Sequence, residues 1–207
     1  MGIMSTTMTQ RFVAVVGSVL IGSGMMVGLD SPVHSRPLKL EPAPKEVQMR
    51  SGGFQLKPGT KIFVQLGHQS EDRIAAETLA EEVESQAGLK LDIFGMKAAA
   101  KAEDGAIVLA RLQDSRVRKF LAENGLKADD ALGEQGYLLF SDNSHLIVAA
   151  NSGEGLFYGV QTLRQLLQPK GDGLLCPGVG IRDWPGLNQD VPSNLSQLST
   201  PQILNER

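Results

Sequence analysis

Histidine and cysteine are frequent nucleophiles, bases and metal ligands, and this chain has few of them. His34, His68 and His145 are far apart in the sequence, and no HExxH-type metal motif is present. Cys176 is the only cysteine, so the chain can form neither an intrachain disulfide nor a zinc site built from cysteines. Its position just before the predicted strand Val179–Asp183 favours a small buried apolar side chain. A reactive thiol and an intermolecular disulfide are the alternatives.

Two other segments have residue types suited to chemistry. Glu81, Glu82 and Glu84 form an acidic cluster, but they lie opposite the apolar stripe of a predicted helix, which favours a solvated face. The glycine-rich segment 151–155 resembles a phosphate-binding loop but lacks the Lys and Ser/Thr of a P-loop and the third glycine of a dinucleotide fingerprint. We therefore predict no catalytic residue, no metal ligand and no cofactor. The sequence leaves any substrate-binding residue unknown.

The elements that would position these residues follow from periodicity. Apolar residues at helical spacing predict helices over 70–88, 115–123 and 152–167. Ser70 and Asp114 are suitable N-caps for the first two. The third carries Gly155 and Gly159 four residues apart, so both lie on one face, where a strand or helix can approach closely.

Alternating or continuous apolar runs predict the strands. Short strands at 47–50 and 54–56, around the turn-forming Ser51–Gly53, and a third at 61–66 are expected to form a small antiparallel set. Residues 136–140 and 145–150 flank a four-residue loop and predict a hairpin that includes His145. Further strands are predicted at 89–94, 105–112 and 179–183.

Composition and segment character define the domain organisation. Hydrophobic residues make up 42% and charged residues 21% of the 207, which is typical of a folded soluble domain. The net charge of −3, with no Lys/Arg cluster, argues against a nucleic-acid partner. Arg11 followed by an apolar run from Phe12 to Leu29 predicts a signal peptide over 1–35, hence an exported protein with no stable membrane association after cleavage. An uncleaved anchor or a buried helix are the alternatives.

Three prolines predict an extended lead-in over 36–45, followed by one α+β domain over 46–185. Residues 186–207 are polar, include Pro192 and Pro201, and predict a disordered tail.

The second half of the chain carries a specific motif series. Its parts are Glu134–Phe140 (EQGYLLF), Leu146–Asn151 (LIVAAN), Gly155–Leu167 (GLFYGVQTLRQLL) and Ile181–Pro185 (IRDWP). In this order they resemble the N-terminal, pre-barrel domain of glycoside hydrolase family 20, the β-N-acetylhexosaminidase-like enzymes. The resemblance extends more weakly to Glu41–Glu46 and to the helix after Ser70.

This resemblance implies an antiparallel or mixed sheet with two helices packed on one face, and a Trp184-Pro185 step that leads into a catalytic (β/α)₈ barrel. In the family, the substrate's acetamido group is the nucleophile, and an Asp-Glu pair in the barrel orients it and protonates the leaving group. No Asp is directly followed by Glu in these 207 residues. Residues 186–207 are also far shorter than a barrel, which takes on the order of 200 residues or more. The position of the family's sugar-binding arginine is Asp190, followed by Val191 in place of glycine.

Three hypotheses follow. The first is a non-catalytic accessory domain of a β-N-acetylhexosaminidase-like hydrolase, as a truncated product lacking its barrel. The second is a stand-alone exported module that binds carbohydrate or protein, which an exposed aromatic platform would favour. The third is an independent enzyme that uses carboxylates not yet identified.

Overall fold

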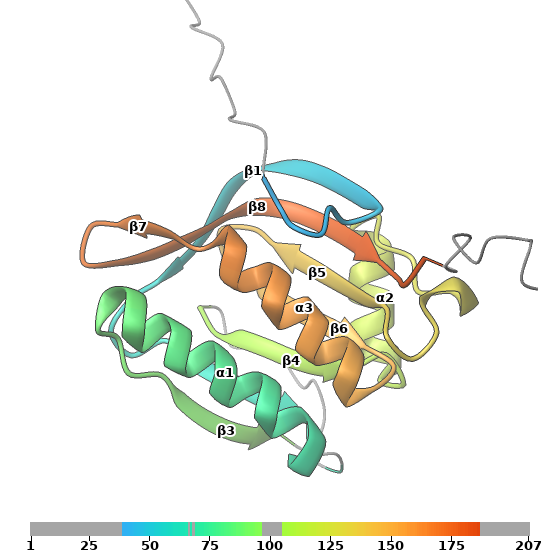
Figure 1. The fold of residues 1–207 in the computed structure, drawn as a ribbon, viewed down its shortest axis with the longest axis horizontal. Helices are drawn as coiled ribbons and strands as arrows, with labels where there is room; N and C mark the ends of the chain where they lie inside the picture. Colours follow the sequence, from blue (N-terminus) through green and yellow to red (C-terminus); the bar gives the residue numbers. More distant parts are fainter. Residues whose placement is uncertain (1–38, 66, 68, 97–104, 187–207) are drawn as a thin grey trace, which may run out of the picture. The chain divides into compact units, whose positions relative to one another are not determined.

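The computed structural model describes residues 39–65, 67, 69–96 and 105–186. The predicted signal peptide, residues 36–38 of the lead-in and the predicted tail from 187 onward lie outside them. The described residues form an α+β domain around one mixed sheet of eight strands (Figure 1). The strands are β1 (Glu46–Leu56), β2 (Lys61–Gln65), β3 (Asp92–Met96), β4 (Ile107–Arg111), β5 (Tyr137–Ser141), β6 (Leu146–Ala150), β7 (Gln168–Lys170) and β8 (Gly173–Asp183). The helices are α1 (Gln69–Ala87), α2 (Ser115–Glu123) and α3 (Gly153–Leu166), with a 3-10 turn, η1, at Asp130–Leu132.

The sheet has an antiparallel half and a parallel half. Its order is β1-β8-β5-β6-β4-β2-β3, and β7 pairs with β8 beside this path. The pairs β1/β8, β8/β5 and β5/β6 are antiparallel, whereas β6/β4, β4/β2 and β2/β3 are parallel. The parallel strands need crossover connections, which α1 and α2 supply.

Helices cover both faces of the sheet, which corrects the expectation of two helices on one face. Helices α1 and α3 lie side by side on one face, here called the α1/α3 face (Figure 1). The third helix, α2, packs on the opposite face through Val117 and Leu121. The segment 115–123 does fold as the short helix predicted from its pattern, with Asp114 as N-cap. The expected number of two helices came from the family resemblance alone.

Side-chain alternation divides the apolar residues between two cores. Ile62 and Val64 of β2 face the core beneath α1 and α3, so Phe63 between them faces the other side. Strands β4, β5 and β6 are buried along their whole length because both of their faces are covered. No helix among the described residues is both long and apolar enough to cross a bilayer.

The N-terminal strands differ from the predicted set. A single strand, β1, runs through Ser51–Gly53, and its pairing with β8 shifts register between Met49 and Gly53. Gly52 has a φ of 78°, and the Gly53 N–H donates to Asn143 Oδ1 at 3.0 Å. The glycines therefore form a β-bulge and not a turn. The predicted antiparallel pairing with 61–66 is also wrong, because β2 lies in the parallel half of the sheet.

The second half of the chain follows its sequence pattern closely. The predicted hairpin is β5 and β6, paired from Tyr137↔Ala150 to Ser141↔Leu146. The Gly155 N–H donates to Ser152 Oγ at 3.1 Å, so Ser152 is the N-cap of α3. A Cβ built on Gly159 would lie 2.4 Å from Val148 Cγ1, which confirms close packing of this helix face on the sheet.

Candidate functional site

Strand β8 ends at Asp183, and the ring of the next residue, Trp184, lies close to two cationic groups. The guanidinium carbon of Arg182 lies 4.2 Å from the ring centroid and Lys45 Nζ lies 5.4 Å from it. Arg182 also pairs with Glu46 Oε1 at 2.7 Å and with Asp129 Oδ1 at 2.5 Å. Hydrogen bonding from Arg182 lowers the pKa of Asp129. The last residues of the domain are thus joined to the start of β1 and to the N-cap of η1.

An open groove runs beside Trp184 along α3, and we call it the exit groove. Its volume is about 440 Å³, and it is lined by Glu41, Pro42, Ala43, Lys45, Gln135, Tyr137, Tyr158, Gln161, Thr162, Gln165, Asp183, Trp184, Pro185 and Gly186. Gln165 fixes one wall, because its side-chain amide exchanges hydrogen bonds of 2.9 and 3.0 Å with the backbone of Glu41. Tyr137 and Thr162 share a hydrogen bond of 2.6 Å, and burial raises the pKa of Tyr137.

A second arginine is buried where β4 ends. Arg111 donates to Asp72 Oδ1 at 2.6 Å, to Glu71 Oε2 at 2.8 Å and to the Asn151 carbonyl at 2.9 Å. The side chain of Asp72 is 0% exposed and that of Arg111 is 5% exposed. Burial alone would lower the pKa of Arg111, but the hydrogen bonds to Asp72 and Glu71 raise it overall. This network connects β4, α1 and the loop before α3.

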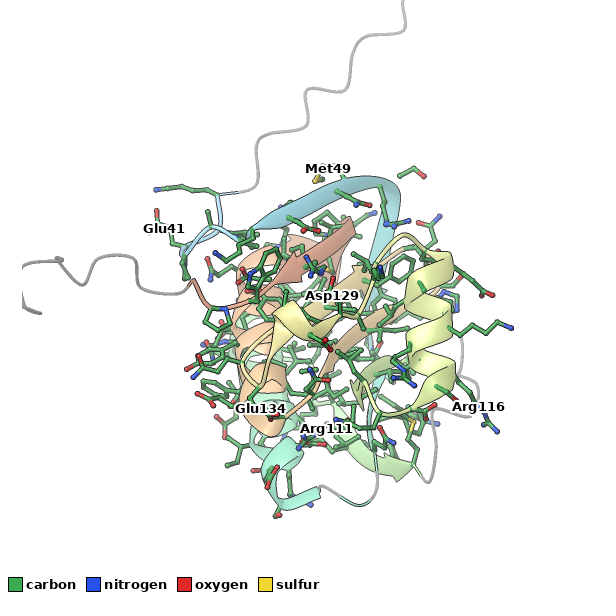
Figure 2. The ribbon with its side chains drawn as sticks, turned by 90° about the vertical axis from the view of Figure 1, so that its right-hand side faces the viewer. Glu41, Met49, Arg111, Arg116, Asp129 and Glu134 are labelled. Atoms are coloured by element: carbon green, nitrogen blue, oxygen red, sulfur yellow. The ribbon has the colours of Figure 1, made fainter. Side chains whose placement is uncertain are left out.

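Beside this network lies another groove, which we call the acidic groove. It has a volume of about 620 Å³ and is lined by Glu71, Ile74, Glu134, Ser152, Gly153, Glu154, Phe157 and Tyr158. Figure 2 looks at this end of the sheet, with α2 and α3 on opposite sides and with Arg111, Asp129 and Glu134 all labelled on it. Tyr158 lines both grooves, so they adjoin along α3.

The acidic groove gathers carboxylates from three separate parts of the chain, next to the buried Asp72. Asp72 is fully buried, and Glu71, Glu134 and Glu154 line one groove. Two of these three are engaged as acceptors. Glu71 accepts from Arg111, and Glu154 accepts from Gln135 at 2.7 Å and from Tyr158 at 3.2 Å.

The cluster at 81–84 is only partly a solvated face. Glu81 and Glu84 are exposed, whereas Glu82 turns toward α3 and accepts from Arg164 Nε at 2.6 Å. Hydrogen bonds from Gln86 and Arg164 lower the pKa of Glu82. This carboxylate links α1 to α3, so its role is structural.

The histidines and the cysteine are not brought together in the described part of the chain. Cys176 is fully buried within β8, as predicted, and burial raises the pKa of its thiol to about 12. His145 lies in the loop before β6, not in the strand, and its Nδ1 is 3.2 Å from Asp142 Oδ1. His34 and His68 fall outside the described residues. Across residues 39–186, apart from the gaps, no group of side chains suited to hold a metal occurs.

The glycine-rich segment 151–155 serves packing. Asn151 Nδ2 donates to the Gly133 carbonyl at 2.8 Å, and Ser152 Oγ donates to the Glu134 carbonyl at 2.6 Å. A Cβ on Gly153 would lie 2.8 Å from Glu71 Cβ. The glycine therefore lets α1 approach the start of α3.

The sequence matches the model of glycosyl hydrolase family 20, domain 2, over residues 38–184. The chain belongs to this family. The match ends at Trp184, the residue held by Arg182, so the family 20 domain comprises the whole sheet, the three helices and most of the lead-in.

Several proteins similar to this family 20 domain are hexosaminidases. The N-acetyl-β-hexosaminidase of Streptomyces plicatus, solved in complex with Thio-NAglucal, is 30% identical, with a TM-score of 0.52 over 74% of this chain and 28% of its own. The family 20 β-N-acetylhexosaminidase of Streptomyces coelicolor is 28% identical, with a TM-score of 0.51 over 70% of this chain and 26% of its own. A β-hexosaminidase of Porphyromonas gingivalis is 26% identical over 161 residues, or 74% of this chain and 18% of its own.

The chain thus spans less than a third of the length of these relatives, in which the domain is one part of a longer enzyme chain. Sequence reasoning identified the family and the Trp-Pro exit, but it missed both arginine networks. A usable signal existed, because Arg111 and Arg182 each interrupt the apolar run of a predicted strand, and a charge that becomes buried requires partners.

Proposed function

We propose that this protein is a non-catalytic accessory domain of a β-N-acetylhexosaminidase-like glycoside hydrolase, and that it docks a (β/α)₈ catalytic barrel on its α1/α3 face. The observation that carries the proposal is the position of Trp184. Just after the end of β8 it lines the exit groove, which adjoins the acidic groove through Tyr158. A domain that follows β8 would begin next to this surface.

The exposed apolar residues of the α1/α3 face support this assignment. Ile74 on α1 is 58% exposed and Tyr158 on α3 is 42% exposed, and both line the acidic groove. Val47 and Met49 of β1 are 42% and 51% exposed. They pair with Ile181 and Val179, whose side chains face the core under α1 and α3, so they lie on the same side of the sheet. Exposed apolar surface rimmed by polar groups is characteristic of protein contacts.

The opposite face provides a matched control. Phe94 of β3 is 42% exposed, the same fraction as Tyr158. It pairs with Phe63, and the neighbours Ile62 and Ile93 point toward the α1/α3 core, so Phe94 faces away from it. A substitution at Phe94 therefore removes an aromatic side chain with the same exposed fraction as Tyr158, but it leaves the proposed docking surface unchanged.

A chimaera tests the proposal. Residues 38–185 would replace the matched domain of the Streptomyces plicatus enzyme, and hydrolysis of a chromogenic N-acetylglucosaminide would be measured. We expect the chimaera to be active. The I74D/Y158D variant of the chimaera should lose this activity and should give less soluble protein. The F94D variant should keep the chimaera's activity. Equal loss in both variants, or none in I74D/Y158D, would contradict docking on this face.

We also propose that the protein is exported, on the basis of the apolar run from Phe12 to Leu29 after Arg11. N-terminal sequencing of protein recovered outside the cytoplasm should give a mature end near Arg36. An intact Met1 on all of the cellular protein would oppose export.

A further inference from the structure

The guanidinium of Arg182 contacts four residues: Lys127, Glu46, Asp129 and Trp184. Nε donates to the Lys127 carbonyl at 3.1 Å, Nη1 to Glu46 at 2.7 Å and Nη2 to Asp129 at 2.5 Å. The same planar group lies 4.2 Å from the centroid of the Trp184 ring. The side chain is only 10% exposed. Hydrogen bonds in three directions fix the plane of the guanidinium, and the guanidinium in turn presents a fixed plane to Trp184.

The lead-in holds the same region from a second direction. The Lys45 N–H donates to Asp183 Oδ1 at 3.1 Å, and the Lys45 ammonium lies 5.4 Å from the Trp184 ring. Trp184 itself is half-buried and packs against the apolar cluster under α2. Trp184, which we call the exit residue, therefore contacts both the start of the domain and its end.

We infer that Arg182 is a positioning residue that fixes the Trp184 side chain, and with it the direction in which the chain leaves the domain at Pro185. A cation over an aromatic face is attracted by the ring quadrupole, and arginine adds planar stacking that lysine lacks. Hinges between domains need a few residues free to rotate. The Arg182 cluster removes this freedom at Trp184. The orientation of a barrel after Pro185 rests on the proposed function, whereas the immobility of Trp184 does not.

Trp184 is the only tryptophan of the chain, so its fluorescence reports on this site alone. In the wild-type protein we expect anisotropy that decays only with the tumbling of the whole domain and weak quenching by acrylamide. R182M should add a nanosecond component of side-chain rotation. It should also raise the acrylamide quenching constant, by roughly twofold if losing the cation–π contact exposes the ring for a comparable share of the time. R182K should restore the charge but not the wild-type anisotropy.

Arg116 provides the matched control, because it is exposed on α2 and projects away from the domain (Figure 2). R116M makes the same change in charge and should leave both fluorescence signals unchanged. Fast rotation of Trp184 in the wild-type protein would overturn the inference, as would wild-type anisotropy in folded R182M or R182K. If R182M does not fold, the anisotropy of R182K and of the wild-type protein still tests the inference. An inactive chimaera with a rigid Trp184 would count against the proposed function and leave this inference standing.

Discussion

Two arginines at the same end of the sheet, Arg111 and Arg182, are almost equally buried but have different partners. Arg111 pairs with Asp72, whose side chain has no exposed surface. The partners of Arg182 are Asp129 and Glu46, whose side chains are 41% and 48% exposed. Water can replace Arg182 at its carboxylates, but it cannot reach Asp72 without opening the core. The first network therefore holds the domain together, whereas the second holds the exit residue.

The comparison is tested most strongly by removing each arginine. R111M should lower the free energy of unfolding by about 3 to 5 kcal/mol, because it leaves an uncompensated charge on buried Asp72. R182M should lower the free energy of unfolding less, because water can hydrate the partly exposed carboxylates of Asp129 and Glu46 once the arginine is gone. Urea unfolding of both variants measures the difference. The double variant R111M/D72N should recover part of the loss, and a cost of R182M equal to that of R111M would break the distinction.

The next effect concerns the packing of α3 on the interior side. A Cβ on Gly159 would meet Val148 Cγ1 at 2.4 Å and the Tyr137 ring at 3.1 Å. Overpacking of this kind costs about 1 to 3 kcal/mol, so G159A should lower the denaturation midpoint and G159L should lower it further. Y158A, next to it on the exposed side of α3, should have little effect. In a V148A background the cost of G159A should shrink, and an unchanged cost would mean that another contact is responsible.

A smaller effect should appear in alkaline solution. The pKa of Cys176 is raised to about 12 by burial, whereas an unfolded thiol titrates near its ordinary value of about 8.5. Above that value the unfolded state loses its proton before the folded state does, so stability should fall as the pH rises. Unfolding at pH 9 to 10, roughly the range below tyrosine ionisation, should show this slope in the wild-type protein and not in C176A. The same slope in both would assign it to another group.

The smallest expected effect is local to the exit. The Arg182 hydrogen bond lowers the pKa of Asp129 from its ordinary value. The associated stability is present above the unfolded-state pKa and is lost as the pH falls through the folded-state pKa. Carboxyl NMR titration should show the pKa of Asp129 rising in R182M and staying unchanged in R116M. An unchanged value in R182M would mean that Arg182 does not hold this carboxylate in solution.

The sequence predicts the local elements well and the long-range pairing poorly. The β5–β6 hairpin and the Ser152-capped helix α3 are specified by turn residues, caps and apolar period within short segments, and both form within a residue or so of their predicted bounds. The partners of β1 and β2 depend on strands far away in the chain, so period alone could not place β1 against β8. Ser51–Gly53 has turn composition, but a glycine pair suits a bulge equally well.

The candidate site shows the same limit. Trp184-Pro185 was identifiable by resemblance, and the two arginines stand out in the sequence only as charges within apolar runs. The acidic groove is assembled from α1, the loop before β5 and α3, so its three glutamates are neighbours only after folding. No spacing within the sequence brings Glu71, Glu134 and Glu154 together.

The central claim is that these surfaces serve protein contact and not chemistry, and the isolated chain tests it directly. The measurement is hydrolysis of a chromogenic N-acetylglucosaminide by purified protein from a host without hexosaminidase, with E71Q, E134Q and E154Q as matched variants. General acid–base catalysis needs a proton donor in reach of the scissile oxygen, yet Glu71 and Glu154 are held as acceptors by Arg111, Gln135 and Tyr158. We predict no turnover above the buffer rate in any of the four proteins. Turnover by the wild-type chain that disappears in one of these glutamine variants would contradict the account.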